Sequence, residues 1–267
     1  MCYYNGFKVS KTDYITLLGI EKDLRHYNIN KHVQSGFDYG NYPIAKPVPV
    51  EKDWEIVEAH WEYIPFWINN MEELKQYRQG IDPKTGKRSQ PIPWLNFKGE
   101  TVVESKMFRQ SALSRRCLVL STHFFESRHI QIMGKRGTLL KTPEIFPYVI
   151  ELKDQELFYM AGIWTPWTDK TTGETMETFA LGTTEANSFM RQIHNSKNRM
   201  PTILTGSLAD EWISPGLSEK RITELASYQI PSNQLQAHLI DKNFKSSFDP
   251  KAPFDYGDIV PSLQYEN

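Results

Sequence analysis

The chain has 267 residues, enough for one large domain or two small ones. Its 39% hydrophobic and 24% charged residues exclude an intrinsically disordered protein, and a formal net charge of −1 excludes a global positive field that would attract nucleic acid. No apolar run approaches the roughly 20 residues of a membrane span, the N-terminus lacks the apolar core of a signal peptide, and two cysteines exclude a disulfide scaffold. We therefore expect a cytoplasmic protein with no membrane association.

The first half of the chain is predicted to hold an amphipathic helix, a loop rich in Gly, Pro and Tyr, a strand, and an insertion with a short helix and turns. In chain order these segments occupy residues 12–27, 35–49, 54–67 and 69–95. Thr12 or Asp13 can cap the helix, and the strand is expected to end near Pro65.

The second half alternates strands and helices without a regular βαβ order. We expect a helix at 105–116, a strand at 117–130, a strand pair within 147–167, a strand at 177–183, helices at 184–194, 210–213 and 218–227, and a strand at 236–240. The helix at 184–194 is expected to open at Thr183 or Thr184. The pattern favours an α+β fold in one domain over residues 1–242, with a mixed, largely antiparallel and partly barrel-like β core flanked by helices, followed by a polar tail at 243–267.

Cys2 directly follows the initiator Met1. Met aminopeptidases generally remove Met1 when the next residue is small, so the mature chain is expected to begin with Cys2. Its α-amine and thiol have ordinary pKa values of about 8 and about 8.5, so reactive forms of both are accessible near neutral pH. Such a 1,2-aminothiol condenses with an aldehyde to an imine and then to a thiazolidine. The alternative from these two residues alone is a terminus that frays in solvent.

Two titratable residues have contexts that suit acid–base chemistry. Glu126 ends the apolar stretch LVLSTHFF, where a carboxyl group is either at the wet end of a strand or buried with a raised pKa. His194 is close to Lys197 and Arg199, and two cations would lower its pKa and keep the ring neutral. A histidine in such a place is otherwise a structural residue.

Other segments carry weaker signals. Trp61 and Trp67 flank a proline in WEYIPFW, where one of them could stack on a base instead of packing in the core. NFKGET, residues 96–101, combines an amide, a cation and a carboxylate, although polar turns of this kind are common. Cys117 is expected to be a buried core thiol. Seven cations accompany one carboxylate between residues 106 and 136, which makes either a phosphate-binding patch or a solvated helix face: Lys106, Arg109, Arg115, Arg116, Arg128, Lys135 and Arg136.

Six short segments, taken in this order, resemble the SRAP family (SOS response-associated peptidase), whose members shield abasic sites in single-stranded DNA. They are Met1-Cys2, WEYIPFW, NFKGET, SKMFR, RCLVLSTHFFES and IHNSKNRMP, and they run from Cys2 to about Leu204. The resemblance departs from the family pattern where its Gly-Arg after the cysteine is Tyr3-Tyr4 here, which removes an arginine phosphate contact unless another cation replaces it. It also departs at Ser127, where the family has Trp.

The resemblance implies a role for each matching residue. Cys2 would be the covalent residue, Asn96 would orient the reacting centre, Glu126 would act as the acid/base, and His194 would assist ring opening. Lys98, Lys106 and Arg199 would contact phosphates, Trp67 would wedge or stack at the splayed nucleotides, and Thr183 would line the site. No cofactor and no metal are required.

These inferences predict a DNA-damage response protein that cross-links covalently to abasic sites in single-stranded DNA through Cys2 and shields them from strand cleavage. We expect a monomer, associated with the nucleoid in a bacterium. The alternatives are a Cys–His peptidase or autoprotease with Cys2 as nucleophile, a non-catalytic binder of single-stranded DNA, and a lyase that cleaves the strand from the imine.

Overall fold

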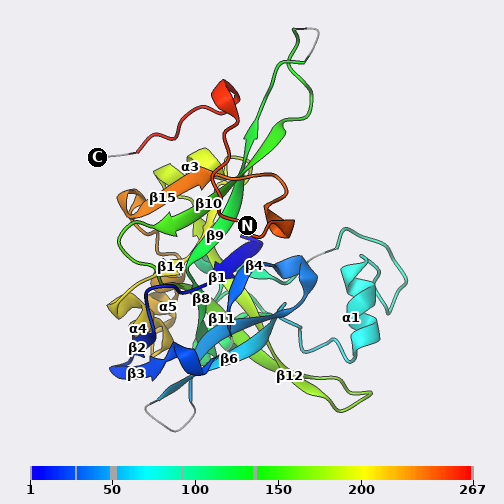
Figure 1. The fold of residues 1–267 in the computed structure, drawn as a ribbon. Coiled ribbons are helices and arrows are strands. Elements are labelled where there is room, and N and C mark those ends of the chain that lie inside the picture. The colour runs from blue at the N-terminus through cyan, green and yellow to red at the C-terminus, as the bar shows by residue number, and fades with distance from the viewer. Residues whose placement is uncertain (1, 28, 49–52, 92, 135–136, 266–267) are drawn as a thin grey trace.

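The computed structural model describes residues 2–27, 29–48, 53–91, 93–134 and 137–265 (Figure 1). Met1 lies outside the described residues, as do Lys135 and Arg136 of the run of cations. Among the residues described, no helix is both long and apolar enough to cross a lipid bilayer.

Five strands close into a barrel. Each pairs with two others, in the order β12, β6, β5, β8, β11 and back to β12, and only the β6–β12 pairing is parallel. The strands are β5 (Asn41–Pro47), β6 (Trp54–Trp61), β8 (Arg116–Ser121), β11 (Phe158–Thr168) and β12 (Thr175–Glu185). All residues of β8 are buried, which explains its continuous apolar run. The expected single-domain α+β fold with a mixed, partly barrel-like core is thus confirmed.

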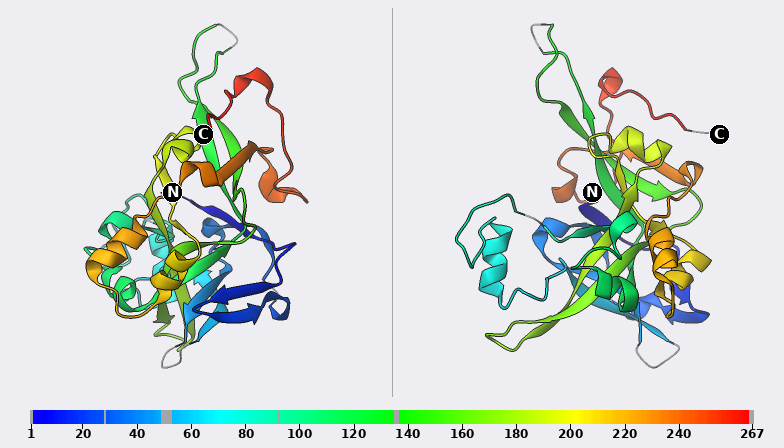
Figure 2. Two further views of the ribbon diagram at one scale, coloured as in Figure 1. Left: turned by 90° about the vertical axis from the view of Figure 1, so that its left-hand side faces the viewer. Right: turned by 180° about the vertical axis from the view of Figure 1, so that it is seen from behind.

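A second sheet continues from the barrel. Its order is β15, β10, β9, β1 and β4, and all its pairings are antiparallel. The strands are β1 (Tyr4–Phe7), β4 (Lys31–Ser35), β9 (His123–Ile130), β10 (Glu144–Leu152) and β15 (Leu235–Leu239). Only Thr122 separates β8 from β9, so the chain passes directly from one sheet to the other. Figures 1 and 2 show the β9–β10 pair projecting beyond the barrel.

Helices and short strands cover the barrel. α2, α4 and α5 pack on barrel strands, whereas α3 packs against β9 and β13. The helices are α1 (Met71–Arg78), α2 (Arg109–Ser114), α3 (Ser188–Ile193), α4 (Ser207–Ile213) and α5 (Glu219–Ala226). Three short strands extend the barrel, namely β7 (Asn96–Lys98) and β13 (Arg199–Pro201) on β12 and β14 (Ile203–Leu204) on β11. The short helix predicted within 69–95 is present as α1, with Asn70 as its N-cap.

The predicted helix at 12–27 is wrong. This segment forms a β-hairpin of β2 (Tyr14–Leu17) and β3 (Ile20–Asp23). Leu18 and Gly19 both have positive φ, 54° and 77°, which is the backbone of a two-residue hairpin turn. Ile15 and Leu17 are buried while their neighbours are exposed, so the two-residue alternation outweighs the weaker helical pattern.

Further elements differ from the expectation. The predicted loop at 35–49 contains β5, and the strand expected at 54–67 ends at Trp61 as β6. The predicted strand at 117–130 is two strands in two sheets, β8 and β9. The two strands expected within 147–167 exist as β10 and β11, but they do not pair with each other, because β10 pairs with β9 and β15 while β11 lies in the barrel. The helix placed at Thr183 or Thr184 begins instead at Ser188, capped by Asn187, because pairing with β7 and β13 keeps β12 extended to Glu185.

The run of cations does not form one patch. The helix predicted at 105–116 is shorter, and Arg116 belongs to β8, where its buried guanidinium donates to carbonyls of Ala112, Leu113, Trp212 and Ser214. Arg109 pairs with Glu219. Most of these cations therefore serve the fold, and Lys106 stands exposed apart from them.

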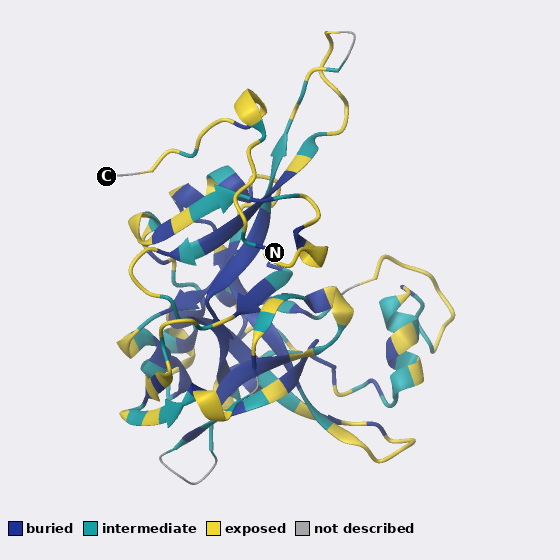
Figure 3. Ribbon diagram, viewed as in Figure 1, coloured by how far each residue is buried: buried dark blue, intermediate teal, exposed yellow. Residues whose placement is uncertain are grey.

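The segment after Lys242 packs back onto the second sheet. Phe244 is only 6% exposed and lies in a small apolar cluster with Phe125, Val149 and Ile240. Tyr256 donates from its hydroxyl to the Ile240 carbonyl. Figure 3 shows this polar segment, mostly exposed, running along the buried strands. Its first residues thereby reach the pocket described next.

Candidate active site

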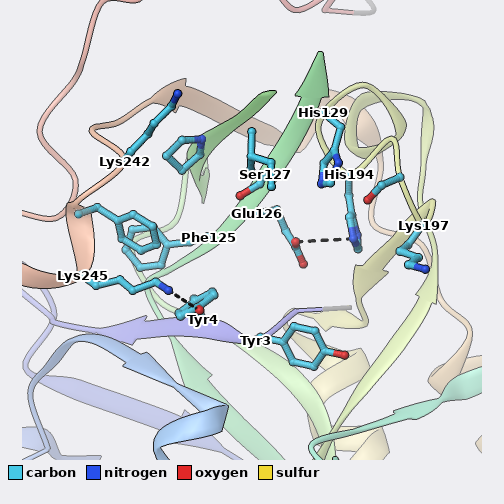
Figure 4. A pocket seen from close by; sticks show the side chains of 14 residues that line it. Tyr3, Tyr4, Phe125, Glu126, Ser127, His129, His194, Lys197, Lys242 and Lys245 are labelled. Atoms are coloured by element: carbon cyan, nitrogen blue, oxygen red, sulfur yellow. Dashed lines mark hydrogen bonds and ion pairs between the residues drawn. The ribbon is translucent and has the colours of Figure 1, made fainter. Parts of the chain in front are cut away.

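A pocket of about 600 Å³ opens where the N-terminal residues meet β9, the loop after α3 and the C-terminal segment (Figure 4). Tyr3 and Tyr4 form one side, and Glu126 and His194 lie between two lysines, Lys197 and Lys245. Together with β10, which contributes Ile145 and Pro147, five segments supply side chains to one cavity. The described part of the chain contains no cluster of His, Cys, Asp and Glu suited to a metal ion.

Glu126 and His194 face each other in the pocket. Glu126 is 8% exposed and His194 is 6% exposed, and His194 Nε2 lies 3.8 Å from Glu126 Oε2. The His194 Nδ1 donates to the Arg199 carbonyl at 2.6 Å, which assigns the proton to Nδ1 and directs Nε2 toward the carboxyl group. Burial raises the pKa of Glu126 to about 8 and lowers the pKa of His194 to about 4. At neutral pH the proton therefore resides on Glu126, and both groups are uncharged.

Cys2 is buried near Glu126 and is not among the residues that line the pocket. In the antiparallel pairing of β1 with β9, Tyr4 lies opposite Phe125, so the residues before Tyr4 run alongside Glu126. The Cys2 Sγ lies 3.6 Å from the Tyr4 carbonyl. Burial, followed by the negative charge of Glu126, raises the pKa of the Cys2 thiol well above its ordinary value. The thiol is thus protonated at neutral pH and close to a carboxyl group that can exchange its proton.

Asn96 carries a buried amide with unsatisfied atoms. It lies in β7 opposite Leu181 of β12, and neither its Oδ1 nor its Nδ2 has a hydrogen-bond partner among the described residues. Unsatisfied buried amides are uncommon in folded proteins and call for an explanation such as a functional role. Asn96 is not among the residues that line the pocket of Glu126 and His194.

Lys98, Thr183 and Arg199 come together at the end of the barrel. Thr183 pairs with Lys98 in the sheet and donates to the Phe97 carbonyl at 2.9 Å. Arg199 donates to both carboxylate oxygens of Glu100, at 2.7 and 2.9 Å, and to the Thr183 carbonyl. Burial alone would raise the pKa of Glu100, but the hydrogen bonds from Arg199 bring it below its ordinary value. Lys98 is exposed, whereas Arg199 already has a carboxylate partner.

Of the predicted site residues, Glu126 and His194 line the pocket and the others do not. Trp67 precedes α1 and contacts Phe66 edge to face, with ring centroids 5.1 Å apart, and Phe66 is 78% exposed. Lys106 is exposed before α2. Trp61 is fully buried and donates to the Leu95 carbonyl, so it is a core residue. Cys117 is also buried in the barrel, as expected.

Several residues that line the pocket were not predicted from the sequence, among them Tyr4 and Lys245. Tyr4 follows the cysteine where no polar function was expected, and Lys245 lies in the segment interpreted as a polar tail. A signal for Lys245 was available in NFKSSF, where the lysine follows an isolated phenylalanine that can anchor a segment. The tertiary contact with Tyr4 had no local signal.

The pKa of Glu126 leads to a stability prediction. The native state holds this proton between the ordinary value of 4.5 and about pH 8, so stability falls as pH rises through that interval. Glu126→Gln keeps the shape without the titration. We expect the melting temperature of Glu126→Gln minus that of the wild type to increase from pH 5 to pH 8.5. The increase should be about 2–4 °C for each kcal/mol of stability that the wild type loses. His194 also contributes to stability, and its contribution is lost as pH falls from about 6.5 toward 4. This contribution is common to the wild type and Glu126→Gln. A difference that stays constant with pH would contradict the raised pKa.

A family model described as SOS response associated peptidase (SRAP) matches residues 22–247. Abasic site processing protein YoaM of Bacillus subtilis is 31% identical over 143 residues, which cover 53% of this chain and 57% of that protein. The chain thus aligns with little more than half the length of that relative. Abasic site processing protein YedK of Escherichia coli is 27% identical over 251 residues, which cover 91% of this chain and 93% of that protein.

Solved structures share the fold. A protein from Bacteroides thetaiotaomicron, 28% identical, superposes with a TM-score of 0.69 over 94% of this chain and 97% of that one. A phage-related protein from Bordetella bronchiseptica, 18% identical, superposes with a TM-score of 0.62 over 90% of this chain and 95% of that one. At 18% identity the second likeness concerns the fold alone.

Proposed function

Because the chain belongs to the SOS response-associated peptidase family, we propose that it processes abasic sites in DNA by a covalent cross-link through Cys2. The curated relatives above are named abasic site processing proteins. We further propose that the substrate is single-stranded, that a monomer suffices, and that the protein works in the cytoplasm at the nucleoid.

The observation that carries the proposal is Cys2 buried beside Glu126, whose carboxyl group is neutral at pH 7 and faces His194. A mature N-terminus at Cys2 would place an amine and a thiol next to a proton donor. Glu126 Oε1 has no hydrogen-bond partner among the described residues, so it can serve a bound substrate. General acids and bases with a pKa near the working pH are the most effective.

The chemistry balances without a cofactor. The Cys2 amine adds to C1′ of the ring-opened deoxyribose, and an amine proton moves to the carbonyl oxygen to give the carbinolamine. Glu126 protonates the hydroxyl, which leaves as water, and the product is a protonated imine that keeps its N–H. The Cys2 sulfur then bonds to the same carbon, the C=N bond becomes single, and the thiol proton passes to the Glu126 carboxylate, which restores the carboxyl group. The product is a thiazolidine without a free aldehyde. It blocks the β-elimination that breaks the strand.

Other residues would hold the DNA. The unsatisfied amide of Asn96 can bond the hydroxyl of the opened sugar. The exposed Lys98 and Lys106 would contact phosphates, and Trp67 beside the exposed Phe66 would stack on a base. Arg199 and Thr183 would line the DNA site as one unit, because the Arg199 guanidinium donates hydrogen bonds to Thr183 and to Glu100. These bonds limit the freedom of Arg199 to reach a phosphate.

The peptidase alternative lacks a supporting observation. A nucleophilic cysteine is activated by a lowered pKa, whereas burial and Glu126 raise the pKa of Cys2. In the imine pathway the amine attacks first, so the thiol can stay protonated until the imine has formed.

The direct test is incubation of the purified protein with single-stranded DNA that carries one abasic site. We expect a band of lower mobility on a denaturing gel and a mass equal to protein plus DNA minus one water. Undamaged DNA of the same sequence is the control. A complex that dissociates in denaturant would leave only non-covalent binding, and a cleaved strand without the adduct would indicate a lyase.

His194 is proposed to assist reopening of the thiazolidine, because its Nε2 faces the Glu126 carboxyl group that holds the proton. We expect His194→Ala to form the cross-link. When a competing abasic oligonucleotide is added, the variant should release the DNA at a rate lower than that of the wild type by a factor of about 10² or more. His238→Ala is the matched control, since its ring also contacts a backbone carbonyl, that of Lys251, outside this pocket. Equal release from wild type and His194→Ala, at matched folded fractions, would assign His194 a purely structural role.

A further inference from the structure

The C-terminal segment reaches the pocket through Phe244. Its ring stacks on Phe125, with centroids 4.8 Å apart and planes inclined by 24°, and the Tyr4 ring meets it edge to face at 5.8 Å. Phe125 directly precedes Glu126 in β9, and Lys245 directly follows Phe244. The contact between the two phenylalanine rings therefore sets the position of Lys245 relative to Glu126 and His194. Lys245 is therefore held at the pocket by a buried anchor.

Lys245 points its ammonium group into the pocket. The Nζ donates to the Tyr4 hydroxyl at 2.5 Å and lies 4.2 Å from the centroid of that ring. Among the described residues no carboxylate forms an ion pair with it, whereas Lys242 pairs with Glu144 and Lys251 pairs with Glu151 in the same segment. An ammonium has three N–H donors and Tyr4 accepts one, so two remain for an anion.

A second lysine lies across the pocket. Lys197 is exposed in the loop after His194, and no ion pair involves it among the described residues. Figure 4 shows Lys245 and Lys197 on opposite sides of Glu126 and His194. Two unpaired cations thus bracket two uncharged acid–base groups. A substrate that matches this pattern has a neutral reacting centre with an anion on each side.

A nucleotide within a DNA strand has this charge pattern, since a phosphate precedes and follows each sugar. We propose that Lys245, held by Tyr4 and Phe244, and Lys197 bind the two backbone phosphates that flank the reacting sugar. This inference rests on the proposed function. It assigns to the C-terminal segment a part in positioning the substrate, because a sugar held between the two phosphates would lie over Glu126 and His194.

Salt dependence of binding tests the inference without any chemistry. The probe is a single-stranded oligonucleotide with one tetrahydrofuran analogue of the abasic site, which has no aldehyde. Each phosphate contact on a single strand contributes about 0.7 to the slope of log affinity against log salt. We expect Lys245→Gln and Lys197→Gln each to reduce the magnitude of the slope by about 0.7, and the double variant by about 1.4. Lys251→Gln, a lysine of the same segment with a carboxylate partner, is the matched control.

Unchanged slopes for Lys245→Gln and Lys197→Gln, or an equal reduction in Lys251→Gln, would overturn the inference. A companion assay separates it from the proposed function. The rate of adduct formation is measured with abasic DNA and with free 2-deoxyribose, which has the aldehyde but no phosphate. We expect the Lys245→Gln defect with the DNA and not with the sugar. If the wild type reacts with neither, the covalent function fails, while the slopes still decide whether Lys245 binds phosphate.

Discussion

Cys2→Ala should abolish the denaturant-stable cross-link to abasic DNA, because alanine supplies an amine but no sulfur to close the ring. The expected adduct is then at most an imine, which hydrolyses unless a reductant traps it. The effect is a loss of signal below detection on a denaturing gel. The substitution removes a buried thiol next to the Tyr4 carbonyl, so the melting temperature must be compared to confirm that the variant is folded.

Two further variants test whether the effect is specific to the Cys2 thiol and its amine. Cys117→Ala is the matched control, since Cys117 is the other free thiol and is buried in the barrel against Gly162. It should cross-link at the rate of the wild type. A Gly-Ser extension that stays in front of Cys2 keeps the thiol but converts its amine to an amide, and it should abolish the cross-link as fully as Cys2→Ala. Efficient cross-linking by the extended protein would rule out a thiazolidine.

Glu126→Gln should slow cross-link formation by about 10²- to 10⁴-fold, the usual loss when a general acid/base is removed. Glutamine has the same shape and no charge, and at pH 7 the wild-type side chain is also uncharged because burial raises its pKa to about 8. A change in the field of the site therefore cannot account for the loss. The rate is followed on denaturing gels under single-turnover conditions with excess protein.

The pH profile identifies the group that acts. Loss of the Glu126 proton as pH rises through about 8 should lower the rate of imine formation. The α-amine has an ordinary pKa of about 7.7–8.0 and acts oppositely, since it must lose its proton to attack. The wild type should therefore show a bell-shaped profile, and Glu126→Gln should keep only the rising limb. Glu151→Gln is the control, a carboxylate on β10 that pairs with Lys251. If the pH–rate profile of Glu126→Gln is still bell-shaped, the fall in rate at high pH is due to another group.

Local patterns in the sequence predicted part of the fold correctly and failed at identifiable places. The buried run at Cys117–Leu120 and the strand through Phe179–Thr183 were recognisable because each is a short, mainly apolar run. The pattern of residues 12–27 predicts a helix, because Leu17, Ile20 and Leu24 recur at i, i+3 and i+7. Contacts with the rest of the molecule, such as the Leu18 amide to Asp210, favour the hairpin, and no local window contains them.

The same distinction applies to the site. The sequence by itself determined the chemical groups: an aminothiol behind Met1, a carboxyl group on an apolar strand, and a histidine at the end of a helix. Only the tertiary structure decided that Glu126 and His194 lie 3.8 Å apart, because that distance depends on the packing of α3 against β9. It also decided which cations are available. Arg116 and Arg109 are used by the fold, while Lys245 reaches the pocket because Phe244 is buried against Phe125. A sequence lists charges, but burial and pairing, which set their pKa values and their freedom to bind, arise only when distant segments meet.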